Sequence, residues 1–587
     1  MKTGSTAFAI VLLLIGLVIG VGLGYAIHSP STKTITQTVP TTVTQTSTVT
    51  QTSTTTATVT QTTTQTVTPP TSGITFQTKS MVMPSPLTGV NENVTLITFS
   101  NSTSTWYQYT YYNYGNCLLP EWTMVYYYPY NLPHDPSQSP NWTVYAFSQN
   151  HESYLNISFP AVEWAYEQMN GLPLNAPFPA YQALGNKSSA VTLTQMVGDA
   201  VGVSYYDGIV YVPADSNAIY AINAYTGKLV WMATTANSVM SNPLVIDTPK
   251  GPIVISSIGD AGFSASHGLF AAVTGNFANV IRGYSYGAVY AFNATDGQLL
   301  WVHFDRGNVM PTPAYIDGLV IYGDGSGHIV ALNATTGQVV WRTYVGVSAF
   351  DSMSSTNYYI FPNGTAIAIM GFTLAEPPYG ELVAVNVANG NIVWKFTLPK
   401  GYTPFNTGMG DVSPAVDQSR AIVVQSTIVN FVKSNKTIGF AVFALNATNG
   451  HLLWIEQVGR GYVPPAFKGG VPLIYDGVVY VGSPVTNTIY AINETDGAII
   501  WEAKIPGVQG PPSGAGGGRA NPVVVNGYLI EPAGSYVDVY NASNGMLIKS
   551  YYVGGRFGIV NAVVVGSTVF LDNSYSWAFA IPLANLI

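Results

Sequence analysis

One phrase recurs along this chain and constrains its fold more than any other feature. The stretch NATDGQLLW at Asn293–Trp301 returns as NATTGQVVW at Asn333–Trp341. Seven copies of this Asn-x-x-x-Gly-x-x-x-Trp pattern, the last of them decayed, follow one another at spacings of 40 to 70 residues. They occupy Ala221–Trp231, Ala291–Trp301, Ala331–Trp341, Ala384–Trp394, Ala444–Trp454, Ala491–Trp501 and Val539–Lys549. A period of this length is typical of the four-stranded blades of a β-propeller.

The phrase itself predicts a strand, a tight turn and a second strand. A strand ends at the Asn, the Gly supplies the positive φ of the turn, and an alternating strand follows. The Trp lies four residues beyond the Gly, where we expect it to wedge against the neighbouring blade. The six intact positions are Trp231, Trp301, Trp341, Trp394, Trp454 and Trp501. The phrase is therefore interpreted as architecture and not as a site of chemistry.

The strands around each phrase predict an all-β, eight-bladed propeller over residues 199–587, with seven blades as the alternative. In one blade, Thr312–Asp317 reads as the innermost strand, followed by Leu319–Gly323 and His328–Asn333. The last blade has three strands in Asn561–Pro582 and lacks a fourth. We expect residues 74–198 to supply that strand, near Asn141–Ser148, because ring closure removes exposed sheet edges. We expect one short helix at Pro160–Gly171.

The N-terminal region indicates export from the cytoplasm. Residues 1–6 include Lys2, and Ala7–Ile27 is an uncharged apolar run that would span ~30 Å of hydrocarbon. This run is either a retained membrane anchor, with the rest of the chain outside, or a cleaved signal. Residues 28–73 are rich in Thr, Ser and Gln and predict an extended stalk. Twelve Asn-x-Ser/Thr sequons follow the stalk and are typical of an extracytoplasmic glycoprotein.

The amino-acid composition indicates the habitat of the protein and excludes some classes of partner. Charged residues make up 8% of the chain, against roughly 25% in ordinary soluble proteins. A surface of Thr, Ser, Asn, Gln and Tyr is indifferent to pH, which favours an acidic habitat, with a glycosylated surface protein at neutral pH as the alternative. No basic stripe indicates nucleic-acid binding. The single cysteine, Cys117, excludes an intramolecular disulfide and a Cys-rich metal site. We expect no metal and leave a homo-oligomer open.

Propeller geometry sorts the loops between two faces and gathers the candidate site on one of them. The Asn–Gly turns lie on one face, and the loops that lead from a fourth strand to the next blade lie on the other, beside the central channel. We predict the catalytic residue among Asp351, Asp411 and Asp305, with Asp260 and Asp324 behind them. We predict that a small anionic substrate binds at Arg306, Arg282, His267, Ser352, Ser354 and Arg519. Taken singly, each such Asp or Ser is also explained as a turn residue bonded to its own backbone.

The repeated phrase resembles the tryptophan-docking repeat of pyrroloquinoline-quinone-type propellers. That resemblance covers about Asp199–Ile587 and implies the fold rather than a chemistry, because such propellers include dehydrogenases, hydrolases and scaffolds. A quinoprotein dehydrogenase would hold pyrroloquinoline quinone beside Ca²⁺. Such enzymes commonly carry two adjacent cysteines under the cofactor, and one Cys makes that feature impossible here. A non-catalytic scaffold of the cell envelope is the other alternative.

A closer resemblance is to the tetrathionate hydrolases of acidophilic sulfur oxidisers. It rests on MPTPAYIDG at Met310–Gly318, FDSMSS at Phe350–Ser355, the low charge, the export signal and the long second-blade insertion. It implies an extracytoplasmic enzyme without quinone that splits tetrathionate with water at very low pH. Arg and His donors would bind the two sulfonates. An Asp would activate the water, and it stays ionised in acid only where a nearby cation lowers its pKa.

Overall fold

The computed structural model describes 66–67, 74–84, 91–100, 105–111, 122–127, 130–132, 139–167, 202–214, 218–235, 238–259, 286–306, 309–347, 354–405, 408–462, 469–506, 517–534, 536–553, 561–573 and 577–587. Residues 1–78 with 98–103 form one compact unit, and residues 79–97 with 104–587 form another. The predicted anchor and stalk at 7–27 and 28–73 lie almost wholly outside the described residues. Among those residues, no helix has the length and apolarity needed to cross a membrane.

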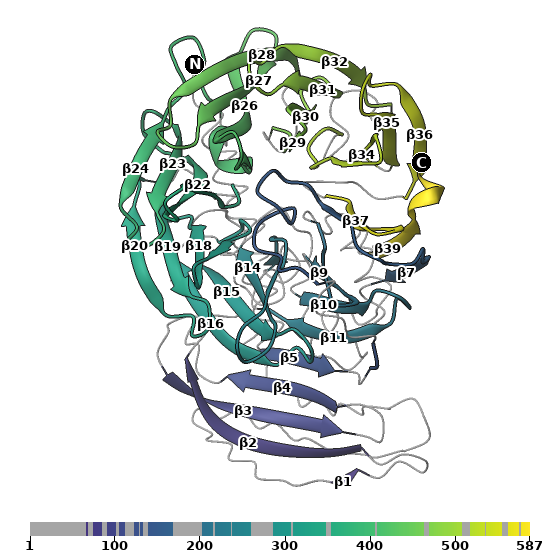
Figure 1. Ribbon diagram of the computed structural model, residues 1–587. Helices are drawn as coiled ribbons and strands as arrows, with labels where there is room; N and C mark the ends of the chain where they lie inside the picture. Colours follow the sequence, from purple (N-terminus) through teal and green to yellow (C-terminus); the bar gives the residue numbers. More distant parts are fainter. Residues whose placement is uncertain are drawn as a thin grey trace, which may run out of the picture. The chain divides into compact units, whose positions relative to one another are not determined.

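Eight antiparallel sheets follow one another around a central axis, which confirms the predicted eight-bladed propeller (Figure 1). Blade 1 contains β8 (Ser204–Tyr206), β9 (Ile209–Ala214), β10 (Ala218–Asn223) and β11 (Leu229–Thr234). Blade 2 contains β12 (Ser238–Val239), β13 (Leu244–Ile246), β14 (Ile253–Gly259), β15 (Tyr286–Asn293) and β16 (Leu299–Arg306). Blade 3 contains β17 (Ala314–Ile316), β18 (Leu319–Gly323), β19 (His328–Asn333) and β20 (Val339–Tyr344). Blade 4 contains β21 (Asn357–Ile360), β22 (Ala366–Thr373), β23 (Gly380–Asn386) and β24 (Ile392–Phe396).

The second half of the ring repeats the same order. The 3-10 helix η4 (Gly408–Asp411) precedes blade 5, which contains β25 (Ala415–Asp417), β26 (Ile422–Val432), β27 (Thr437–Asn446) and β28 (Leu452–Tyr462). Blade 6 contains β29 (Leu473–Tyr475), β30 (Val478–Ser483), β31 (Thr488–Asn493) and β32 (Ile499–Lys504). Blade 7 contains β33 (Val523–Val525), β34 (Tyr528–Ala533), β35 (Tyr536–Asn541) and β36 (Leu547–Tyr552). Blade 8 contains β37 (Val563–Val565), β38 (Thr568–Asn573) and β39 (Trp577–Pro582), and η5 (Leu583–Asn585) follows.

Burial explains why inner and outer strands read differently in the sequence. The central strands β18 and β19 are buried at almost every position, because blades pack on both of their faces. The outermost strand β20 has every position exposed or half-buried. Inner strands therefore read as continuous apolar runs, and only the outer strand alternates.

The ring is closed by β7 (Trp164–Glu167), which pairs antiparallel with β39. The predicted position of this strand near Asn141–Ser148 is therefore wrong, as is the helix expected at Pro160–Gly171. A second short strand, β6 (Tyr154–Leu155), pairs in parallel with β37. Trp164 donates its indole N–H to the carbonyl oxygen of Ala224 in blade 1 at 2.8 Å. The closing strand thus carries its own docking tryptophan, outside the repeated phrase.

Upstream strands widen blade 1 at its outer edge. β5 (Trp122–Tyr127) pairs with β11, and β4 (Thr105–Tyr111) pairs with β5. Both strands, TWYQYTY and WTMVYY, are rich in aromatic residues. β1 (Thr66–Val67) belongs to the first compact unit, and β2 (Ile74–Pro84) and β3 (Asn91–Ser100) contribute residues to both units.

Residues 142–155, here called the channel segment, run through the centre of the ring, where Figure 1 shows a dark blue trace. Its backbone bonds to the innermost strands of successive blades. Val245, Tyr315, Val416, Ile474 and Val564 donate their amides to the carbonyls of residues 142, 143, 149, 150 and 153, at 2.7–3.1 Å. The stretch expected to complete blade 8 instead fills the channel.

Candidate functional site

A belt of polar side chains links the segments that precede the innermost strands of blades 2, 3, 4, 5 and 8. The amide of Asn242 donates to Thr312 Oγ1 at 2.9 Å, and that of Thr312 to Ser355 Oγ at 3.1 Å. The amide of Ser355 donates to Ser413 Oγ at 3.0 Å. Asn242 Nδ2 extends the belt on the other side by donating to Asn561 Oδ1, ahead of blade 8, at 3.2 Å. These bonds fix which residues of successive blades are structurally equivalent.

We call the position two residues before each belt residue the rim position. Reactive or polarisable side chains occupy it in four blades. The rim residue is Met240 in blade 2, Met310 in blade 3, Asp411 in blade 5 and Arg519 in blade 7, where Asn521 is the belt residue. The exposed fractions of these residues are 2%, 0%, 2% and 6%. Equivalent positions in four blades therefore hold two methionines, one aspartate and one arginine, all of them buried. Charges buried this deeply are placed in a low-dielectric environment.

Tyr145 of the channel segment lies in one buried cluster with the two rim methionines. It belongs to a buried cluster with Ala146, Met240, Met310 and Val471. These residues come from the channel segment and from blades 2, 3 and 6, so the channel segment shares a small buried cluster with three blades. Burial and the charge of Glu531 in blade 7 raise its pKa, which keeps the phenol protonated.

Asp411 is held by its own loop and by the preceding blade. It is the last residue of η4, and Ser354 donates its amide to the carbonyl of Gly410 at 2.7 Å. The hydroxyl of Ser354 accepts the Gly371 amide at 2.8 Å. Ser354 is fully buried, and it therefore positions the turn that carries Asp411.

Two further buried titratable groups lie around Tyr145. His151 stands edge-on to the Tyr145 ring, with centroids 5.2 Å apart, and its Nδ1 lies 2.8 Å from the Pro472 carbonyl. Burial lowers the pKa of His151 to about 4, although the bond to Pro472 opposes this. Burial and Asp538 raise the pKa of Glu531 well above its usual range, against the backbone N–H of Gly518. Burial thus keeps Glu531 neutral in acid, whereas His151 is neutral only above about pH 4.

Asp305 and Asp324 belong to a different cluster, between blades 2 and 3. Asp305 lies on the fourth strand β16, where it accepts the Tyr322 hydroxyl at 2.8 Å and pairs with Arg342. Arg342 also reaches Asp324 at 2.9 Å, and burial raises the pKa of Asp324 to about 6. Burial and then Arg342 lower the pKa of His303 to about 4. This cluster joins two blades through shared ion pairs.

Of the sequence-predicted site residues, Asp411 and Arg519 occupy the rim position, Ser354 supports the Asp411 turn, and Asp305 belongs to the cluster between blades. Asp351, Ser352, Arg282, His267 and Asp260 lie outside the described residues, as does the side chain of Arg306. Sequence reasoning did not single out Tyr145, His151, Glu531 or the rim methionines. Met240 and Met310 each stand three residues before a proline, as Asp411 and Arg519 do. This shared spacing could have identified the two methionines from the sequence.

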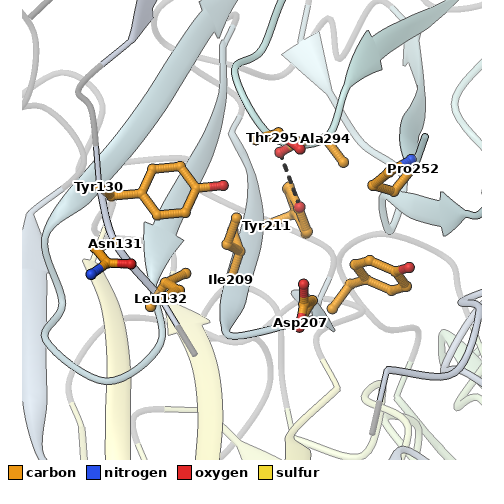
Figure 2. Close-up of a pocket in the computed structure, with 10 residues that line it drawn as sticks. Tyr130, Asn131, Leu132, Asp207, Ile209, Tyr211, Pro252, Ala294 and Thr295 are labelled. Atoms are coloured by element: carbon orange, nitrogen blue, oxygen red, sulfur yellow. Dashed lines mark hydrogen bonds between the residues drawn. The ribbon is translucent and has the colours of Figure 1, made fainter. Parts of the chain in front are cut away.

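The opposite face holds a cavity of about 420 Å³ (Figure 2). It is lined by Tyr130, Asn131, Leu132, Tyr206, Asp207, Ile209, Tyr211, Pro252, Ala294 and Thr295. Asp207 lies in the turn between β8 and β9, and Thr295 lies in an Asn–Gly turn. None of the sequence-predicted site residues is among its lining. Within the described ranges, no group of three His, Cys, Asp or Glu side chains is arranged to hold a metal ion.

Comparison with known proteins gives one family of repeats and two close relatives. The family described as outer membrane protein assembly factor BamB matches residues 180–356, 257–443 and 439–548. A tetrathionate hydrolase of Acidianus ambivalens is 44% identical over 508 residues, which cover 81% of this chain and 91% of that protein. A tetrathionate hydrolase of Acidithiobacillus ferrooxidans is 36% identical over 439 residues, covering 72% of this chain and 81% of that protein.

Proposed function

This chain belongs to the tetrathionate hydrolase family, and from this premise we propose that it hydrolyses tetrathionate outside the cytoplasm at low pH. The observation that carries the proposal beyond family membership is the shared rim position of Asp411 and Arg519. A buried carboxylate and a buried guanidinium occupy equivalent positions, three residues before a proline, ahead of the innermost strands of blades 5 and 7. Such a pair supplies a base for water and a cation for a sulfonate.

In the proposed reaction, tetrathionate and water become thiosulfate, sulfate, sulfur and two protons. The water oxygen bonds to a terminal sulfonate sulfur while Asp411 accepts one of the water protons. The adjacent S–S bond breaks, and its electron pair leaves with the remaining three-sulfur anion, which then yields sulfur and thiosulfate. Arg519 holds a sulfonate, and Ser354 acts as a positioning residue for the Asp411 turn. Asp351, the first candidate base from the sequence, remains a proposed base beside Asp411, and Arg282, Arg306, His267 and Ser352 remain proposed ligands of the substrate.

The reaction needs water and protein side chains, and we propose that it uses neither quinone nor metal. The export signal and the sequons support a site of action at the cell surface, with the chain either anchored or secreted. Raised pKa values of buried carboxyl groups support a protein that folds best in acid, because such groups are neutral there.

The direct test is turnover by the purified full chain. Tetrathionate loss would be followed at pH 2 to 4, with sulfate and thiosulfate measured as products. We expect one sulfate and one thiosulfate for each tetrathionate consumed. No loss of tetrathionate by a folded protein would overturn the proposed function.

A further inference from the structure

The cavity on the face of the Asn–Gly turns, drawn in Figure 2, takes its lining from three parts of the chain. Residues 130–132 form one side, and residues around the turn between β8 and β9 form another. Pro252, Ala294 and Thr295 of blade 2 complete it. Its volume of about 420 Å³ is sufficient for a small ligand. No step of the proposed hydrolysis uses this cavity.

The side chains of the lining favour a neutral, hydroxyl-rich ligand over an anion. Tyr130, Tyr206 and Tyr211 contribute aromatic rings, and Asp207 and Asn131 contribute a carboxylate and an amide. The negative face of an aromatic ring attracts the C–H groups of a sugar, and carboxylate and amide groups bond to its hydroxyls. None of the described lining residues is a Lys, Arg or His, so tetrathionate would meet no cation there.

Hydrogen bonds hold two of these rings in place. The hydroxyl of Tyr206 donates to Asp247 Oδ1 at 2.5 Å, and that of Tyr211 donates to the carbonyl oxygen of Ala294 at 3.1 Å. The cavity is therefore formed before a ligand enters it, which lowers the entropic cost of binding.

A glycosylation sequon borders the cavity. Asn293 is the last residue of β15 and begins the sequon Asn-Ala-Thr, whose second and third residues, Ala294 and Thr295, line the cavity. In the sheet, Asn293 pairs with Ile253, the residue that follows Pro252 of the lining. Asn293 Oδ1 accepts the amide of Thr295 at 2.8 Å, so the oxygen of this side chain is used by the turn. Its nitrogen, Nδ2, is the atom to which a glycan is attached.

We propose that Asn293 carries an N-linked glycan and that the first sugars of this glycan occupy the cavity. The occupant is covalently part of this chain and begins beside the cavity, so no free ligand is required. The glycan then joins residues 130–132 to blades 1 and 2. The inference rests on the proposed export of the chain and not on its hydrolytic activity.

The attachment is a group transfer by a glycosyltransferase of the host from a lipid-linked phosphate donor. The anomeric carbon of the sugar bonds to Asn293 Nδ2, and the amide gives up one proton. The bond between the anomeric carbon and the phosphate oxygen breaks, and its electron pair leaves with the phosphate. No oxidant or reductant is needed.

Asn333 is the equivalent residue of blade 3 and provides a matched control. It also begins a sequon, and its Oδ1 accepts the amide of Thr335 at 3.0 Å. None of the described lining residues of the cavity belongs to blade 3. A glycan on Asn333 therefore begins at the same kind of turn without this cavity beside it.

The test compares the full chain from its native host with Asn293→Asp and Asn333→Asp, which keep the acceptor of the turn and remove the sequon. Mass spectrometry of glycopeptides should show a glycan on Asn293 in wild type. Hydrogen exchange of the amides at residues 130–132 should be about fivefold faster in Asn293→Asp than in wild type, and unchanged in Asn333→Asp. Unchanged exchange in both variants, or equal acceleration in both, overturns the proposed position of the glycan.

Tyr130→Ala provides a second measurement, because it removes a ring of the cavity and leaves the sequon intact. The Tm shifts of Tyr130→Ala and Asn293→Asp should not add, since both remove the same contact, whereas those of Tyr130→Ala and Asn333→Asp should add. Additive shifts in both pairs overturn the proposal. The exchange measurement changes no residue of the cavity lining, so it decides the matter if Tyr130→Ala fails to fold.

The outcomes separate this inference from the proposed function. An Asn293 without a glycan in a chain that is glycosylated at Asn333 overturns the inference alone. A chain without a glycan at either sequon overturns the inference and contradicts the proposed export. Absence of tetrathionate turnover by wild type overturns the proposed hydrolysis and leaves the glycan untouched.

Discussion

The turn face carries the same residue in successive blades, whereas the rim of the channel carries different residues. On the turn face, six tryptophans donate their indole N–H groups to a carbonyl in the following blade, at 2.7–3.0 Å. At the rim, equivalent positions hold Met, Met, Asp and Arg. The same residue recurs in the repeat where every blade needs the same packing contact. The rim has no such shared requirement, so it is where different chemistry can be placed.

Gly297 shows why the turn face tolerates little change. Its φ is +73°, and a Cβ placed on it would lie 2.7 Å from the ring of Trp231. The same residue therefore allows both the turn and the docking of the preceding blade. Neither constraint applies at the rim.

The largest expected effect is on the rim. Asp411→Asn keeps the size of the side chain and removes the base, so kcat should fall by roughly 10²- to 10⁴-fold. Steady-state rates with tetrathionate at pH 3 measure this. Asp305→Asn is the matched control, because it should weaken the junction of blades 2 and 3 while the folded enzyme retains its kcat. Full activity of Asp411→Asn would transfer the role of base to another residue, with Asp351 first.

A substitution on the turn face should affect stability alone. Trp231 is fully buried and bonds to Ala294. Trp231→Ala should lower the free energy of unfolding by about 3–5 kcal/mol, measured by denaturant titration. The residual folded protein should keep the wild-type KM. A changed KM with unchanged stability would contradict the conclusion that the docking tryptophans affect stability and not substrate binding.

Buried carboxyl groups predict how stability depends on pH. Burial raises the pKa of Asp538 to about 6, against a bond from Ser550. The folded state then binds a proton more tightly than the unfolded state, so the stabilisation is complete below pH ~4 and is lost as pH rises through about 6. The difference from the ordinary Asp pKa of 3.8 makes this loss about 3 kcal/mol.

Asp538→Asn should remove that loss, so the variant gains stability relative to wild type at pH 7 and not at pH 3. Thermal unfolding of both proteins at the two pH values measures the difference. The comparison isolates Asp538 from His151 and His303, whose lowered pKa values act in the opposite direction. Equal differences at both pH values would show that Asp538 titrates normally.

The smallest expected effect concerns the turn itself. Asn333 Oδ1 accepts the amides of Thr335 and Thr336 at 3.0 and 3.1 Å. Asn333→Ala should cost about 1 kcal/mol of stability. Asn333→Asp keeps the acceptor and removes the sequon, so it should retain stability. A loss as large in Asn333→Asp would assign the effect to a glycan.

Much of the fold could be predicted because the repeat is local. Blade 3 shows this, since the strands expected at Leu319–Gly323 and His328–Asn333 are observed with the same bounds. The closing strand was placed wrongly because Asn141–Ser148 and Trp164–Glu167 both read as apolar and aromatic. Only pairing with β39, more than 400 residues away, selects the second. No local pattern encodes a partner at that separation.

The sequence by itself determined the repeated blade and its docking tryptophans, because each depends on spacing within one repeat, and it favoured eight blades over seven. Tertiary structure decided which of the loop residues meet. Asp411 and Asp305 look alike in the sequence, each beside the end of a strand. The fold brings one to the rim with Arg519 and ties the other to Arg342 between two blades. The physical reason is that residues more than 100 positions apart share a channel only when the ring closes around it.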